Sequence, residues 1–295
     1  MKRILFGTDG SAGALAAARH LSHLPHHRDV HVHIVAALAV HDAASIAEAA
    51  LKETEEALGS FPGHVTSAMS RADSTGEIVD ILLATADYAE ADLIAVGACG
   101  RSALDRFVIG SVAEGIARHA DRPVLIARDS TVSPRVIVGV DGSEESRLAA
   151  RFAARMLPED RTLLLLHALN SPSGVVPTVD PVIAGAYYQA VEQQIATEQK
   201  EGARMLETLG EDIAVGGHNV DTLLTIGNPA AELIRVAEEQ KAGLIVVGAR
   251  GLTRVDRFLL GSVSERVVRH AHCSVIVFRR HTPDKVSVGK QNATC

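Results

Sequence analysis

The chain has 295 residues, a length that suits two α/β domains of roughly 150 residues each better than a single one. Apolar residues make up 47% of it, which is enough to bury sizeable cores and excludes a disordered chain, and no apolar run reaches the length of a membrane span. The formal net charge of −7 lacks the basic surplus of nucleic-acid-binding domains, so we expect no nucleic-acid partner.

The first half alternates short apolar runs with Ala-rich or acidic helical segments. Each run ends in a turn, as buried parallel strands do. The third run is the weakest, and the acidic stretch at 51–58 is expected to be an exposed helix face. Strands are predicted at residues 4–7, 30–38, 65–69, 93–96 and 124–127.

The second half follows the same order. Leu148, Phe152 and Met156 recur every four residues and mark one face of a helix. Asn228 and Pro229 offer a helix N-cap followed by proline at the first helical position. Strands are predicted at residues 136–140, 162–166, 222–225, 244–247 and 275–278. This alternation predicts an α/β, doubly wound parallel sheet of Rossmann-like type in each half.

The two halves are copies of one another. The segment DRFVIGSVAEGIARHA at 105–120 returns as DRFLLGSVSERVVRHA at 256–271, an offset of 151. ILFGTDGS at 4–11 returns as VIVGVDGS at 136–143, an offset of 132, so the second copy carries an insertion, placed by us at 171–188. We expect two domains, 1–130 and 134–280, with a polar C-terminal tail at 281–295.

A glycine motif recurs in both copies. Gly97-x2-Gly100-x9-Gly110-Ser111 follows the fourth predicted strand of the first copy, and Gly248-x2-Gly251-x9-Gly261-Ser262 follows that of the second. A glycine at a strand's carboxyl end allows close approach to the backbone, and the helix that opens after the last glycine offers free N–H groups to a phosphate. The motif therefore predicts a site for a phosphate-bearing ligand.

An architectural reading of this motif also exists. Ser111 with Glu114, and Ser262 with Glu265, have the spacing of capping boxes, which would explain these residues without a ligand. Capping does not explain the upstream glycines, so we favour ligand binding.

Asp9 and Asp141 end the first strand of each copy. Each can be a turn carboxylate, but the first strand of a doubly wound sheet is central, so its carboxyl end faces the same crevice as the glycine loop. There a carboxylate can accept a hydrogen bond from an adenine or a ribose.

These motifs, found twice over nearly the whole chain, resemble the universal stress protein family in its tandem form. The resemblance implies the adenine nucleotide alpha hydrolase-like fold and the ATP-binding subgroup, with ATP bound with or without Mg²⁺. It implies the following groups of contacts. Gly7, Asp9, Gly139 and Asp141 would border the adenine, and Ala37 and Ala168 would contact it. Gly97, Gly100, Gly248 and Gly251 would line the ribose and phosphates. Gly110, Ser111, Val112, Gly261, Ser262 and Val263 would hold the phosphate end, and Arg101 and Arg250 complete the set.

The first copy departs from the family pattern at Cys99, where the second copy has Arg250 as the family often does. This difference leaves the glycines intact and puts only equal affinity in doubt. His31 and His33 share one strand face, but no Cys or carboxylate companion is evident, so no metal site is predicted. The three cysteines have no metal-like spacing and the N-terminus has no signal peptide, and we expect a cytoplasmic, membrane-free protein.

The predicted function is that of an ATP-binding stress or signalling module with unknown protein partners. No P-loop lysine, G-x-S-x-G elbow or H-E-x-x-H helix occurs, so we expect no enzyme, or at most slow ATP hydrolysis. The alternatives are an adenylating or flavin-using enzyme of the same fold group and an architectural protein without ligand. The last strands, 123–127 and 274–278, carry no protecting charge, so we expect them to pair and form a pseudo-dimer within the chain. A homodimer of the full chain stays open.

Overall fold

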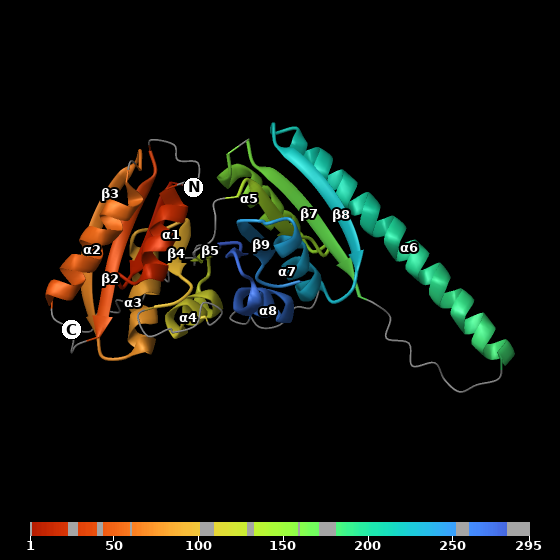
Figure 1. The fold of residues 1–295 in the computed structure, drawn as a ribbon, viewed down its shortest axis with the longest axis horizontal. Helices are drawn as coiled ribbons and strands as arrows, with labels where there is room; N and C mark the ends of the chain where they lie inside the picture. Colours follow the sequence, from red (N-terminus) through yellow and green to blue (C-terminus); the bar gives the residue numbers. More distant parts are fainter. Residues whose placement is uncertain are drawn as a thin grey trace, which may run out of the picture.

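The computed structural model describes residues 2–22, 29–39, 44–59, 61–100, 109–128, 133–158, 160–170, 181–251 and 260–281. Its described strands form one continuous ten-stranded sheet, in the order β3-β2-β1-β4-β5-β10-β9-β6-β7-β8 (Figure 1). Each half contributes five parallel strands in the doubly wound order. The predicted α/β class is confirmed.

Every predicted strand is present, and several are longer than predicted. The first half contains β1 (Arg3–Thr8), β2 (His31–Ala39), β3 (His64–Ala72), β4 (Leu93–Gly97) and β5 (Val124–Ala127). The second contains β6 (Arg135–Gly139), β7 (Thr162–Leu169), β8 (Asn219–Ile226), β9 (Leu244–Gly248) and β10 (Ser274–Phe278). The helices are α1 (Ala12–Ser22), α2 (Ala44–Leu58), α3 (Thr75–Tyr88), α4 (Ser111–His119), α5 (Glu144–Met156), α6 (Pro181–Ala214), α7 (Pro229–Glu239) and α8 (Ser262–His270).

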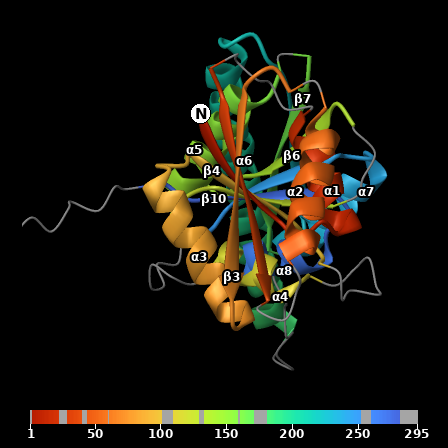
Figure 2. The same ribbon diagram turned by 90° about the vertical axis from the view of Figure 1, so that its left-hand side faces the viewer.

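Helices cover both faces of the sheet, and each face has a large hydrophobic core. Side chains alternate along each strand: Ile4 and Phe6 enter the core that includes α1, α5 and α6, whereas Leu5 enters the core that includes α3, α4, α7 and α8. Figure 2 shows the first half with its sheet nearly edge-on, α3 on one face and α1 and α2 on the other. Each core extends across both halves, which makes the chain one packed body.

The two halves join through their last strands. β5 and β10 pair antiparallel, with Ile126 opposite Val275 and Val124 opposite Val277. Within its own half each of these strands has one neighbour, β4 for β5 and β9 for β10, so each lies at an edge. The predicted pairing of the two final strands is confirmed, and it removes two unprotected edges at once.

A pair of buried arginines fastens the joint reciprocally. Arg279 follows β10 and donates to the carbonyls of Ala117, Arg118 and Ala120 at the end of α4, in the other half. Arg128 follows β5 and donates to the carbonyl of Val268 at the end of α8, at 2.8 Å. A cation suits a helix C-terminus, where carbonyls lack intrahelical partners and the dipole is negative. Each half therefore completes a helix of the other.

Helices α4 and α8 also meet through charges. Glu114 pairs with Arg269 at 2.7 Å, and Arg118 pairs with Glu265 at 3.6 Å. The two pairs are related by the repeat offset, so they form a pseudo-symmetric cluster across the joint.

Helix α6 is much longer than its counterpart α2, with 34 residues against 15. At about 1.5 Å per residue α6 is about 51 Å long, whereas the eight-residue β7 spans about 26 Å. Its C-terminal part packs on the core through Leu206, Leu209 and Ile213. Its N-terminal part projects beyond the carboxyl ends of β7 and β8 (Figure 1). The predicted insertion thus contributes to a helical arm.

Candidate functional site

The predicted site residues lie at the carboxyl edge of each parallel half-sheet. β1 lies between β2 and β4, and β6 lies between β7 and β9, so the first strand of each half is central as predicted. β2 and β4 lie on opposite sides of β1, so the connections that leave these strands diverge. This divergence opens a crevice at the carboxyl ends of the strands. Asp9 and Asp141 stand at that point in the two halves.

The glycine loop of each half is closed by a backbone hydrogen bond. The Gly110 N–H donates to the Ala98 carbonyl at 2.7 Å, and the Gly261 N–H donates to the Ala249 carbonyl at 2.8 Å. The last glycine is thereby brought back to the end of the strand from which the loop departs. Arg101, together with the loop interiors at 101–108 and 252–259, lies outside the described residues.

The predicted capping boxes are wrong. Gly110 and Gly261 are the N-cap residues of α4 and α8, and no side chain of the described residues caps either helix. Ser111 and Ser262 are instead the first helical residues, one position too late for that motif, and both are exposed. Their partners Glu114 and Glu265 form the charge cluster between α4 and α8. The first intrahelical bonds are donated by the Glu114 and Glu265 N–H groups, so the three preceding N–H groups of each helix have no intrahelical partner and point toward the site's phosphate end.

The middle glycine of each motif faces the strand-end aspartate. A Cβ built on Gly100 would lie 2.8 Å from Asp9 Oδ2, and one built on Gly251 would come closer still to Asp141 Oδ2. The other carboxylate oxygen, Oδ1, accepts from the N–H of Ser11 or Ser143, at 3.0 Å in both halves. The turn role and the site position thus coexist in each aspartate.

The first motif glycine has a packing role in the first half. A Cβ on Gly97 would lie 2.6 Å from the backbone of Gly13, at the start of α1. Gly7 and Gly139 similarly allow the side chains of Leu82 and Leu233 to approach their strands, with a built Cβ 3.1 Å from each. Ligand approach is therefore an incomplete explanation for glycine at the end of a strand. Residues of the neighbouring helices also occupy the space that a side chain would need.

In the second half the predicted residues surround one cavity of about 1060 Å³. Nine predicted residues line it: Gly139, Asp141, Ala168, Gly248, Arg250, Gly251, Gly261, Ser262 and Val263. The first-half residues occupy equivalent places on their strands and helix, with Ala37 buried near the end of β2. The cavity is large enough for a nucleotide-sized ligand.

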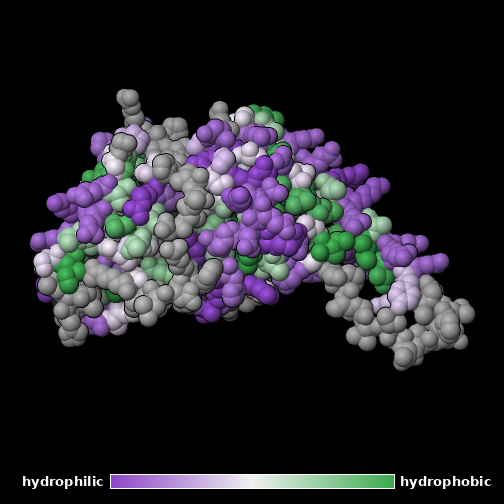
Figure 3. Space-filling view, in the orientation of Figure 1, coloured by the Kyte–Doolittle hydropathy of each residue, from purple (hydrophilic) through white to green (hydrophobic). Residues whose placement is uncertain are grey.

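Sequence reasoning missed one wall of this cavity. The arm of α6 contributes residues spaced alternately four and three apart, which places them on one helix face. They include Tyr187, Val191, Gln194, Glu198, Glu201 and Met205. Hydrophobic side chains gather where the arm leaves the body (Figure 3). The spacing within 187–205 could have indicated a helix face that lines a site. It indicates this only when the helix is known to pass over the site.

The second-half site also contains an ion pair that the first lacks. Arg250 Nε lies 3.5 Å from Glu145 Oε2, and Glu145 is mostly buried at the start of α5. By the repeat offsets, the equivalent residues of the first half are Cys99 and Gly13. A Cβ on Gly13 would overlap the Cys99 carbonyl, so no longer side chain fits there. The two sites therefore differ in their charged side chains, because the second has an arginine and a glutamate where the first has a cysteine and a glycine.

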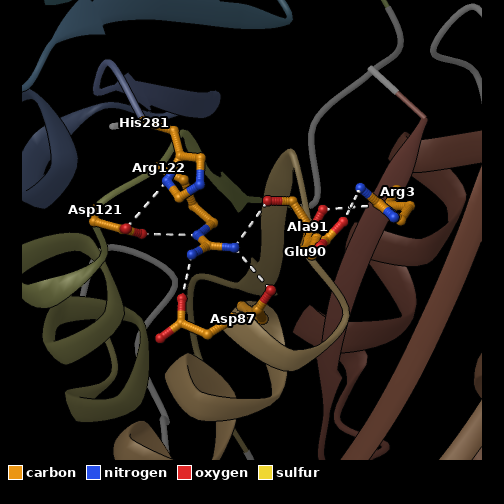
Figure 4. A network of polar contacts seen from close by, with 8 residues as sticks. Arg3, Asp87, Glu90, Ala91, Asp121, Arg122 and His281 are labelled. Atoms are coloured by element: carbon orange, nitrogen blue, oxygen red, sulfur yellow. Dashed lines mark hydrogen bonds and ion pairs between the residues drawn. The ribbon is translucent and has the colours of Figure 1, made fainter. Parts of the chain in front are cut away.

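The halves differ again beside the joint. Arg122 is almost fully buried and donates to the carbonyls of Ala86 and Ala91, while Asp121 bridges Arg122 and His281 (Figure 4). The equivalent position in the second half is Cys273, where burial raises the pKa of the thiol to about 12.

The fold and its edge define a class: a doubly wound α/β protein of two similar halves, each with a glycine-rich turn at the carboxyl edge of its sheet. The family model described as "Universal stress protein family" matches residues 1–128 and again 133–279. The chain therefore belongs to the universal stress protein family and carries two copies of its domain, as the resemblance implied.

Individual relatives agree with this assignment. A universal stress protein of Mycobacterium tuberculosis is 32% identical over 237 residues, which are 78% of this chain and 74% of that protein. The universal stress protein YxiE of Bacillus subtilis is 33% identical over 149 residues, 49% of this chain and 98% of that protein. A crystal structure of a universal stress protein from Archaeoglobus fulgidus shares the fold, with a TM-score of 0.64 at 20% identity over 94% of this chain and 98% of that one.

The described residues show neither a candidate membrane span nor a candidate metal-binding cluster. No described helix is both long and apolar enough to cross a bilayer. Within the same ranges, no three His, Cys, Asp or Glu side chains are grouped to hold a metal ion. His31 instead stacks on His64, with ring centroids 4.7 Å apart, and His33 Nδ1 lies 2.8 Å from Thr66 Oγ1.

Proposed function

We propose that the chain binds ATP, with or without Mg²⁺, at each of its two halves and acts as a nucleotide-dependent module in a stress response. The observation that carries the proposal is the second-half cavity. The residues predicted to contact adenine, ribose and phosphate in this half all line it. Such convergence is what a nucleotide site requires.

The residues fit the chemical parts of ATP in a consistent order. The N–H groups of the first turn of α8, which begins at Ser262, suit the phosphates together with the positive end of the helix dipole. Arg250 adds a positive charge to the lining of the same cavity. Asp141, at the end of the central strand, suits a donor of the base or the ribose, and Ala168 leaves room for a flat ring. In the first half Asp9, Gly100 and the start of α4 supply the same elements.

Chemistry on the bound nucleotide is expected to be slow. The chain has no P-loop lysine motif, so we propose binding rather than catalysis as the function. An adenylating or flavin-using enzyme is the alternative, and the identity of the bound molecule distinguishes the two.

The first experiment is therefore mass spectrometry of small molecules released when the purified protein is denatured. ATP supports the proposal, and flavin would favour the enzyme alternative. Calorimetric titration with ATP should then give two sites per chain, which reduce to one in Gly251→Ala and to one in Gly100→Ala, since either Cβ displaces the aspartate carboxylate.

Matched glycine controls are available in both halves. A Cβ on Gly210 meets Thr222 at an ordinary 3.4 Å, and one on Gly76 lies 3.8 Å from Ser74, so both Ala variants should bind ATP as the wild type does. Unchanged binding in the Gly100→Ala, Gly251→Ala double variant would show that the sites are elsewhere.

A further inference from the structure

The ion pair of the second-half site is incompletely satisfied. Arg250 Nε and Glu145 Oε1 are buried atoms without a hydrogen-bond partner among the described residues, although the two side chains face each other. At 3.5 Å the pair is too long for a strong hydrogen bond. Buried polar atoms without a hydrogen-bond partner destabilise the folded protein. Arg250, which carries one of them, lines the cavity.

The charges around Glu145 come from three elements. Arg250 lies in the glycine loop, Arg279 follows β10, and Asp141 follows β6. Burial raises the pKa of Glu145, the two arginines lower it, and Asp141 raises it. The carboxylate thus depends on arginine partners to stay charged in a partly buried place.

A phosphate group at the start of α8 competes for one of these partners. Arginine binds phosphate through paired, charge-assisted hydrogen bonds, and a phosphate carries more charge than a carboxylate. When Arg250 turns to phosphate, Glu145 loses its nearest cation and acquires a nearby anion. Both changes favour its protonated form.

We propose that Glu145 is a positioning residue of the second site, which holds Arg250 while the site is empty and releases it to the phosphates of a bound nucleotide as the Glu145 carboxylate takes up one proton from solvent. The inference rests on the proposed function and extends it, because it makes nucleotide binding proton-linked at one site only. The first site cannot share this device, since Gly13 and Cys99 occupy the equivalent positions.

The sign of the linkage follows from the direction of the change. Because the pKa of Glu145 is higher with nucleotide bound than without, binding takes up protons and affinity rises as pH falls through the window between those two pKa values. A single proton limits the effect to about tenfold in affinity per pH unit. The phosphates of ATP titrate near pH 6 as well, and this contribution is common to all variants.

The test is calorimetry of ATP binding to the full-length protein between pH 5.5 and 8, in pairs of buffers that differ in ionisation enthalpy. The wild type should take up more protons at the second site than Glu145→Gln, by up to one. Glu145→Gln should also bind ATP more tightly at pH 8, because Arg250 is free. Glu144→Gln is the matched control, because the Glu144 carboxylate is exposed and pairs with Arg280. Its ATP affinity and proton uptake should equal those of the wild type.

A second variant keeps the test sound when the first fails to fold. Arg250→Met removes the cation beforehand, so it should lose the proton uptake too, but with weaker ATP binding instead of tighter. Equal proton uptake in the wild type and in the folded variants, with ATP still bound at two sites, would refute the inference and leave the proposed function intact. A wild type that binds no ATP would refute the proposed function itself.

Discussion

Replacing Arg279 by methionine should destabilise the protein by about 3 kcal/mol. Its guanidinium donates to three carbonyls at the end of α4, and a charge-assisted bond contributes about 1.5 kcal/mol or more. Three such bonds come to about 4.5 kcal/mol, and relief from burying a cation returns part of this, which leaves about 3 kcal/mol. Burial lowers the pKa of Arg279 to about 10, so it is charged at neutral pH and the loss is that of an ionic cap.

Two other arginines calibrate this prediction. Arg128→Met removes one side-chain hydrogen bond, to the Val268 carbonyl. It also removes two buried nitrogens that have no partner within the described part of the chain, so a loss of about 1 kcal/mol or less is expected. Arg280 is adjacent to Arg279 but exposed, and it pairs with the exposed Glu144. Its methionine variant should change stability by less than about 0.5 kcal/mol.

Urea unfolding followed by far-ultraviolet circular dichroism measures all three variants. The chain has no tryptophan and only three tyrosines, so fluorescence is a weak probe. The expected order of cost is Arg279→Met, then Arg128→Met, then Arg280→Met. Equal losses for Arg279 and Arg128, or a loss at Arg279 no larger than at Arg280, would refute the view that the three carbonyl bonds hold the joint.

Three further outcomes are expected. Cys273 should resist iodoacetamide at pH 8 in the folded protein, because burial raises the pKa of its thiol to about 12, and peptide mapping that finds it alkylated before unfolding would contradict this. A fragment of residues 134–295 should dimerise through β10, the strand that loses its partner β5, and a monomer at high micromolar concentration by light scattering would count against the edge argument. ATP turnover should stay far below about 10 per second, and a rate of that size that disappears in Gly251→Ala would make the protein an enzyme.

The strands and their order could be predicted from the sequence because buried parallel strands are apolar runs that end in turns, and because the repeat gave each half a second reading. The edge pairing of 124–127 with 275–278 followed from strand order and missing charges. The glycine positions were also informative, since the spacing survives in both halves.

Other features depend on contacts distant in the sequence and were missed. Glu114 and Glu265 match a local capping pattern, but their partners are arginines on the opposite helix. Arg128 and Arg279 look like ordinary residues after a strand until the other half is placed beside them. The arm of α6 forms a cavity wall only because an inserted segment extends it past the sheet, and no local pattern shows where a helix will project.

The reciprocal joint between β5 and β10 has an evolutionary consequence. In a symmetric dimer of separate chains every substitution appears twice, so both sides of the axis must tolerate it together. Joining the two halves in one polypeptide removes that constraint, and each position can then be altered on one side alone. Arg122 with Cys273, and Gly13 with Glu145, are such divergences. The two halves of one chain can therefore differ at positions that two identical subunits would have to share.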